Sequence, residues 1–80
     1  LEQSYIHLKI LCIEQIKRPG RDYSRLFELI QESQLTIRMR QFLIRELEYE
    51  AFRFKRLSLI QLLDQYSNLL QKLSNATTKL

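Results

Sequence analysis

The 80-residue sequence contains one proline, one glycine, one cysteine and one histidine, and it has no tryptophan. So few proline and glycine residues argue against a β-rich fold, which needs turn residues every few positions, and favour a few long helices. The single Cys12 rules out an intramolecular disulfide and therefore a disulfide-stapled scaffold. Because Cys12 lies between Leu11 and Ile13, we expect a buried structural thiol. The longest apolar run, 10–13, is too short to span a membrane.

The sequence also lacks the residue groups that catalysis and metal binding require. His7 has no partner at metal-ligand spacing, and it lies five residues from Cys12, so the two side chains point to different sides of a helix. A phosphate-binding loop, a zinc pattern and a calcium loop are all missing. We therefore expect no enzymatic activity, no cofactor and no metal.

Apolar residues recur at helical spacing, which predicts an all-α fold. In a first helix, about 3–17, Ile6, Ile10 and Ile13 follow one face, while further apolar residues widen that face to more than half the circumference. Such a helix is buried on more than one side or keeps a face for a partner. A second helix, about 22–33, begins at a candidate cap, Asp22.

Neither glycine nor proline occurs between residues 37 and 73, which predicts a long third helix over 36–74. Thr36 is its candidate cap. Its two halves carry apolar stripes rotated by somewhat under a quarter turn. One continuous or gently kinked helix is therefore favoured over two helices that meet near 55–58. The two short helices would run antiparallel to each other and pack on this long helix, leaving one half of it with an exposed apolar stripe. We expect one helical domain, 1–80. Because the chain begins without methionine, we expect this domain to be excised from a larger protein.

The net charge of +4 is spread unevenly. Basic side chains surround the only Pro-Gly pair, in a segment 17–23 that is itself typical of a turn between helices. Others lie in the third helix, at Arg38, Arg40 and Arg45 and again beside Phe52 and Phe54. Basic residues with interleaved aromatics can hold single-stranded nucleic acid. A solvated helix face is the plainer interpretation, because acidic neighbours at 46, 48 and 50 would repel phosphates.

Two ordered motifs resemble a known family. The run 17–23 (Lys-Arg-Pro-Gly-Arg-Asp-Tyr), followed by Leu26 and Phe27, is similar to the C-terminal domain of Integrator complex subunit six and its sarcoma antigen and cancer/testis antigen relatives. The run 50–56 (Glu-Ala-Phe-Arg-Phe-Lys-Arg) resembles that family's Glu-Ala-Ala-Arg-Phe-Lys-Arg. The resemblance covers roughly residues 8–70. The sequence departs from the family at 32–34, where a Gln-Gly linker is usual, and at Phe52, where a small residue is common.

The resemblance implies a nuclear docking module that binds the helical-repeat C-terminal region of Integrator subunit three. This would place the parent protein in RNA processing, transcription attenuation and the single-stranded-DNA sensor complex of the damage response, with nucleic acid met only indirectly and no membrane or small-molecule ligand. The matching positions imply these contact residues: Arg18, Arg21, Tyr23, Arg53, Lys55 and Arg56, with Lys17 and Phe52 as additional anchors. We expect Phe27 and Phe54 in the core. Two alternatives stay open: direct single-strand nucleic-acid binding, and self-assembly through the exposed half of the long helix.

Overall fold

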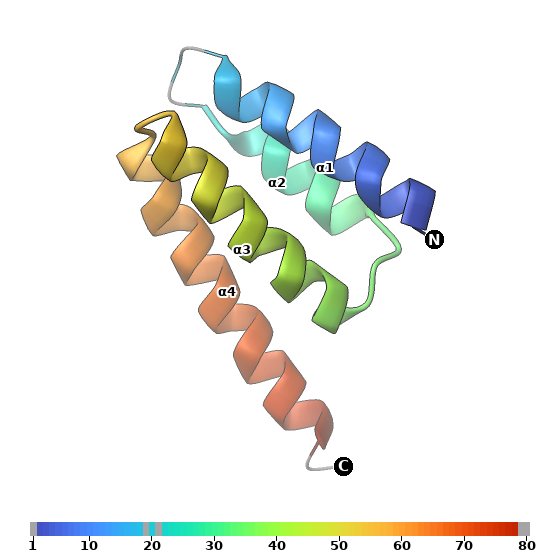
Figure 1. Cartoon of the computed structure of the whole chain (residues 1–80). Coiled ribbons are helices and arrows are strands. Elements are labelled where there is room, and N and C mark those ends of the chain that lie inside the picture. The colour runs from blue at the N-terminus through green and yellow to red at the C-terminus, as the bar shows by residue number, and fades with distance from the viewer. Residues whose placement is uncertain (1, 19, 21, 79–80) are drawn as a thin grey trace.

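The computed structural model describes residues 2–18, 20 and 22–78, and in these ranges it contains helices and no strand. The four helices are α1 (Glu2–Lys17), α2 (Ser24–Glu32), α3 (Ile37–Arg53) and α4 (Leu57–Thr78). Successive helices run in opposite directions, and α4 extends past the beginning of α3 (Figure 1). The most extensive packing joins α3 to α4, and α1 packs on both α2 and α3. The predicted all-α fold is confirmed.

The preference for one continuous third helix was wrong. The helix ends at Arg53, and the chain reverses over residues 54–56 so that α4 returns along α3. Lys55 takes a left-handed φ of 57°, its N–H donates to the carbonyl of Phe52, and the N–H of Arg56 donates to the carbonyl of Ala51. These two bonds define a Schellman motif, which ends a helix with a left-handed residue. The alternative of two helices is therefore correct, with the break at 54–56.

The core lies between the facing apolar stripes of the helices. Because α4 folds back onto α3, the stripes expected on the two halves of a long helix pack against each other rather than leaving one half bare. Each leucine or isoleucine fully buried in this way contributes about 1.5–3 kcal/mol. The fully buried side chains are Cys12, Ile16, Leu26, Ile30, Leu43, Ile44, Leu47, Ala51, Leu59, Leu63 and, almost completely, Leu70. Phe27 and Phe54, expected in the core, are partly buried against it.

The first helix buries a different face from the one that its isoleucines suggested. Its core residues are Leu8, Cys12 and Ile16, whereas Ile6 and Ile10 are each more than half exposed. α1 has apolar residues on most of its circumference, and its extensive packing is on α2 and α3. One apolar face is therefore left over, as in the case of a helix that keeps a face for a partner.

The helix ends follow local hydrogen bonding. Gly20 has a φ of 141°, which side chains rarely adopt, so the chain reversal between α1 and α2 depends on this glycine. Asp22 is not the cap of the second helix, because α2 begins at Ser24 and its cap residue is Tyr23, which makes no side-chain cap bond. The Asp22 carboxylate accepts instead from the Ser24 N–H at 3.0 Å, just before the helix. Thr36 caps α3 as expected, because its hydroxyl accepts from the Met39 N–H at 3.2 Å. Pro19 lies outside the described residues.

Candidate functional site

The two sequence motifs meet at one end of the bundle, although 26 residues, 24–49, separate them in the chain. The connection between α1 and α2 and the connection between α3 and α4 lie at the same end (Figure 1). Lys17 from the first motif and Arg53 from the second both approach the ring of Phe54, with Nζ at 6.0 Å and Cζ at 5.8 Å from its centroid. Both distances fit a cation–π contact. We call this region, formed by the described residues of 17–23 and 50–57, the two-loop end.

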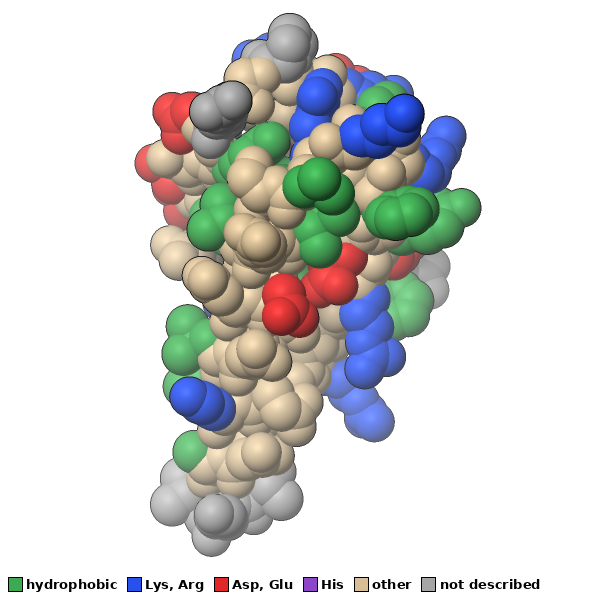
Figure 2. Space-filling view, turned by 90° about the vertical axis from the view of Figure 1, so that its left-hand side faces the viewer, with side chains coloured by type: hydrophobic (Ala, Val, Ile, Leu, Met, Phe, Trp, Pro, Cys, Tyr) green, Lys and Arg blue, Asp and Glu red, His purple; other side chains and the backbone are tan. Residues whose placement is uncertain are grey.

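Most of the predicted contact residues are exposed at the two-loop end. Lys17, Arg18, Arg53 and Lys55 are exposed to solvent. Phe52 is 69% exposed, and Leu57, at the start of α4, is exposed to a similar degree. Figure 2 shows hydrophobic and basic side chains next to one another over the upper part of the molecule, with acidic side chains below them. Arg21 lies outside the described residues.

Two of the predicted contact residues make contacts within the bundle. Tyr23 is only 6% exposed and belongs to the core. Arg56 is half-buried, and its Nε donates to the carbonyl of Ile16 at 2.9 Å while Nη2 donates to the carbonyl of Lys17 at 3.1 Å. These carbonyls belong to the last turn of α1. No helical N–H follows that could donate to them. Arg56 therefore fastens the α3–α4 connection to the end of α1.

Arg40 plays the same part at the other end of the bundle. Its Nη2 donates to the carbonyl of Ser33 at 2.9 Å, just after α2. Sequence reasoning had grouped Arg40 with Arg38 and Arg45 as a basic surface, but only the latter two are exposed. A side chain that crosses to another helix gives no signal in the spacing of its own helix.

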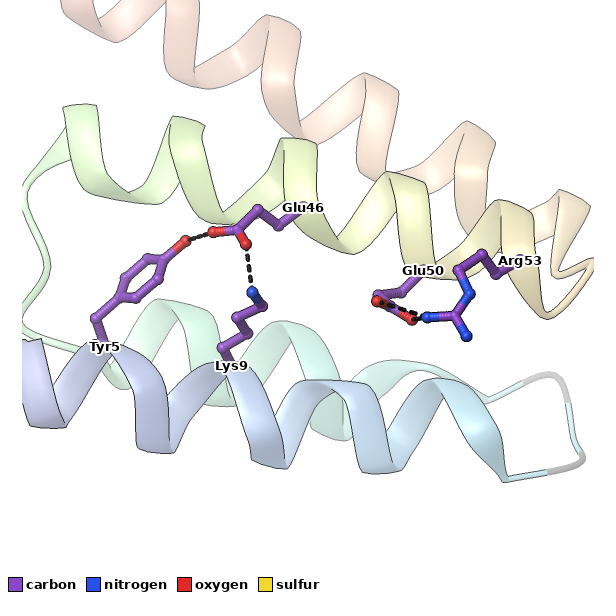
Figure 3. A network of polar contacts seen from close by, with 5 residues as sticks. All are labelled: Tyr5, Lys9, Glu46, Glu50 and Arg53. Atoms are coloured by element: carbon purple, nitrogen blue, oxygen red, sulfur yellow. Dashed lines mark hydrogen bonds and ion pairs between the residues drawn. The ribbon is translucent and has the colours of Figure 1, made fainter.

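Glu46 of α3 joins α1 to α3 through two side chains (Figure 3). The Tyr5 hydroxyl donates to one carboxylate oxygen of Glu46, and the Lys9 ammonium donates to the other. Partial burial opposes ionisation of Glu46, but the hydrogen bonds from Lys9 and Tyr5 outweigh it and hold the pKa of Glu46 below its usual value. Burial, together with the hydrogen bond to Glu46, raises the pKa of Tyr5 well above its usual range. The cluster therefore stays ionised at Glu46 and neutral at Tyr5 at physiological pH.

Arg53 has an intrahelical partner that does not remove it from the surface. Its Nη1 lies 3.2 Å from a carboxylate oxygen of Glu50, one turn earlier in α3 (Figure 3). The Arg53 side chain nevertheless remains 57% exposed. A single exposed pair of this kind is worth a few tenths of a kcal/mol, so a partner carboxylate can compete for the guanidinium.

Other chemistry-bearing side chains are isolated in the described part of the chain. Cys12 is fully buried, as expected, and burial raises the pKa of its thiol to about 12. His7 is exposed. Across the described residues, no three His, Cys, Asp or Glu side chains are grouped so that they could hold a metal ion. None of the described helices is both long and apolar enough to cross a membrane.

Sequence reasoning missed a set of exposed apolar residues along α1 and α3. Phe42 and Tyr49 of α3 lie exposed beside a groove whose other wall is α1. A hollow of about 480 Å³ at one end of this groove is lined by Tyr5, Ile6, Arg38, Met39 and Phe42. The signal in the sequence is a second stripe on α3, at 38, 42, 45, 49 and 52, opposite the residues that enter the core.

Comparison with known proteins agrees with the motifs. The family model described as "INTS6/SAGE1/DDX26B/CT45 C-terminus" matches residues 3–65. Integrator complex subunit 6 of Danio rerio is 34% identical over 64 residues, which are 80% of this chain and 7% of that protein. Integrator complex subunit 6-A of Xenopus laevis is 32% identical over 65 residues, or 81% of this chain and 7% of that protein. The Homo sapiens subunit 6 is 30% identical over 74 residues, or 92% of this chain and 8% of that protein.

The chain thus spans less than a tenth of the length of these curated relatives. The match includes both motifs of the two-loop end, and the family resemblance drawn from those motifs is confirmed. The chain belongs to the INTS6/SAGE1/DDX26B/CT45 C-terminus family.

Proposed function

We propose that this chain is a non-catalytic docking module of a nuclear protein, and that it binds the helical-repeat C-terminal region of Integrator subunit three. In this role it tethers its parent subunit into the Integrator complex and into the single-stranded-DNA sensor complex. The parent would then act in RNA processing, transcription attenuation and the DNA damage response. Relatives named as Integrator subunit 6 support the assignment to this complex.

The observation that carries the proposal is the convergence of the two motifs at the two-loop end. Arg53 and Lys55 lie exposed beside Phe52 and Leu57, and Lys17 reaches the same place from α1. Exposed apolar side chains next to arginine have the composition of a protein-binding hot spot. Arginine also binds carboxylates in a bidentate geometry, so the expected partner surface is an acidic groove.

Tyr23 and Arg56 are assigned a supporting role in this proposal. Tyr23 is almost fully buried, and Arg56 is half-buried with its guanidinium bonded to the end of α1. Among the described residues the contact set therefore consists of Lys17, Arg18, Phe52, Arg53 and Lys55, with Leu57 added. Arg21 also stays a predicted contact.

Direct titration tests the proposal. The purified C-terminal region of subunit three is added to this chain in an isothermal titration calorimeter. We expect saturable binding with one copy of this chain per site and a dissociation constant in the micromolar range or tighter, as for specific interfaces of standard size. An absence of binding at concentrations of about 100 μM would contradict it, because such a Kd is equivalent to only about 5.5 kcal/mol.

Self-association is a second candidate, favoured by one face of α4. Leu62, Leu69 and Leu73 are exposed along that helix at spacings of seven and four residues, which is the spacing of a coiled-coil seam. Sedimentation velocity over a range of concentrations tests it. A rising sedimentation coefficient that Leu69→Glu abolishes supports self-association, and a constant monomer value contradicts it.

A further inference from the structure

We infer that the docking surface extends from the two-loop end along the groove between α1 and α3, and that this groove receives an amphipathic helix of the partner bearing acidic residues beside its apolar stripe. This inference rests on the proposed function, because it concerns the same partner. It adds a second set of contact residues, on the long side of the bundle, that neither motif contains.

The apolar part of the groove comes from two helices. Phe42 and Tyr49 of α3 are 58% and 66% exposed, and Ile6 of α1 shares the hollow with Phe42. The rings of Tyr5 and Phe42 contact each other across the groove in a tilted arrangement, with centroids 6.1 Å apart. Ile10, one turn after Ile6, continues the apolar face on α1. Aromatic and aliphatic side chains exposed together in this way are typical of a groove that takes the apolar face of a helix.

The charges of the groove select an acidic occupant. Its lining acidic residues are already engaged within the bundle, Glu46 by Lys9 and Glu50 by Arg53. Arg38 and Arg45 also line the groove, are exposed, and form no ion pair with any residue that the structure describes. On α3 these two arginines alternate with the aromatics at 42, 49 and 52. An apolar helix flanked by carboxylates therefore matches the groove in both shape and charge.

Continuity joins this groove to the two-loop end. Phe52 ends the α3 stripe and is the exposed aromatic of the second motif. Residues 38 to 52 span about 21 Å of helix at 1.5 Å per residue. A partner helix of four turns lying along this stripe reaches from the hollow at Phe42 to the basic side chains at Arg53 and Lys55.

The first test compares alanine variants in the same titration with the C-terminal region of subunit three. Phe42→Ala and Tyr49→Ala are expected to weaken binding by at least about tenfold each, as for the aromatic anchors of an interface. Leu11→Ala is the control, because Leu11 is 36% exposed but lies outside the groove, beside Leu29 of α2. Circular dichroism establishes that each variant remains helical. Affinities unchanged in Phe42→Ala and Tyr49→Ala would overturn the inference.

The second test identifies what occupies the groove. A photo-crosslinking phenylalanine analogue is placed at position 42, and the residues of subunit three that it captures are mapped by mass spectrometry. We expect them to fall on one helix, beside glutamate or aspartate one turn away. Capture on a basic segment or a loop would overturn the inference. Loss of binding in Arg53→Glu with no effect of Phe42→Ala would leave the proposed function standing and remove this extension, whereas no binding by the unaltered chain would remove both.

Discussion

The guanidinium of Arg56 donates to the carbonyl of Ile16, with Nε and O 2.9 Å apart. This contact links the connection between α3 and α4 to the last turn of α1, across forty residues of sequence. It brings the two motifs of the family together by making one motif cap the helix that leads into the other. The two-loop end is thus a single structural unit.

Removing this link should cost stability rather than only affinity. Arg56→Ala leaves the carbonyls of Ile16 and Lys17 without their charged donor, and we expect the free energy of unfolding to fall by about 1–3 kcal/mol. Arg56→Lys keeps the charge but loses the planar set of guanidinium donors. Its free energy of unfolding should lie between that of the unaltered chain and that of Arg56→Ala. Chemical denaturation followed by circular dichroism measures the difference. A variant as stable as the unaltered chain would refute the supporting role.

The left-handed residue Lys55 offers a separate stability prediction. A side chain at φ 57° is strained relative to glycine, so Lys55→Gly should raise the free energy of unfolding by about 0.5–1 kcal/mol. Lys55→Ala removes the same charge but keeps the Cβ atom and should not stabilise. Thermal denaturation of Lys55→Gly and Lys55→Ala measures the difference in stability. Equal stability of the two variants would contradict the strain at this position. Both variants should bind subunit three more weakly, because both lose the exposed cation.

Residues 54–56 also explain why the division of the long helix was missed. Helices commonly end with glycine in the left-handed position, and Lys55 stands there instead, so the local sequence carries no stop signal. The Pro-Gly pair between α1 and α2 does carry one, and that turn was predicted. The rotation between the two apolar stripes was the remaining trace of the break, but it fitted a kink equally well.

The sequence predicted some residues of the candidate site correctly and could not distinguish others. The motifs indicated exposed Arg53 and Lys55, but nothing local distinguished them from Arg56, whose partner is on α1. The spacing of Ile6 and Ile10 indicated a helical face, yet both of the faces available on α1 are apolar. Only the packing of the other helices decided which one is buried.

Glu46 should make stability depend on pH in the acidic range. Its pKa is lowered in the folded state, so its contribution is complete above its ordinary pKa of 4.5 and is lost as the pH falls through the lowered value. Glu46→Gln should therefore be less stable than the unaltered chain by about 1 kcal/mol at neutral pH, with the gap closing as the pH falls below 4.5 and through the lowered pKa of Glu46. Urea denaturation at a series of pH values measures this gap.

Glu48 provides the control of opposite sign. Burial and the nearby charge of Asp64 raise its pKa, against the attraction of Arg45, so ionised Glu48 disfavours the folded state. Glu48→Gln should be no less stable than the unaltered chain at neutral pH, and any gain should vanish below pH 4.5, where Glu48 is itself neutral in both states. A loss of stability in Glu48→Gln comparable to that in Glu46→Gln would contradict the assignment of both carboxylates.

Cys12 should be inert in the folded chain. Its thiol is fully buried, and burial raises its pKa to about 12, so neither access nor ionisation favours reaction at neutral pH. We expect modification by a chromogenic disulfide reagent to require opening of the bundle and to accelerate steeply with denaturant. A rate matching that of a free thiol in the absence of denaturant would show that α1 does not pack as described.

The central claim, that the two-loop end contacts the partner, is tested most directly by charge reversal. Arg53 and Arg25 are matched, because each is 57% exposed and each pairs with a glutamate three residues away on its own helix. Reversal to glutamate changes the net charge equally at both sites. Its local cost is higher at Arg53, because Glu50 is only 15% exposed against 57% for Glu28 and because a glutamate is unfavourable in the last turn of a helix, so the stability of each variant is measured beside its affinity. Only Arg53 lies at the two-loop end.

The measurement is the dissociation constant for the C-terminal region of subunit three, determined by calorimetry for the unaltered chain, Arg25→Glu and Arg53→Glu. We expect Arg25→Glu to bind as the unaltered chain does, and Arg53→Glu to bind at least about tenfold more weakly while its circular dichroism stays helical. Equal affinities of all three proteins would contradict the claim.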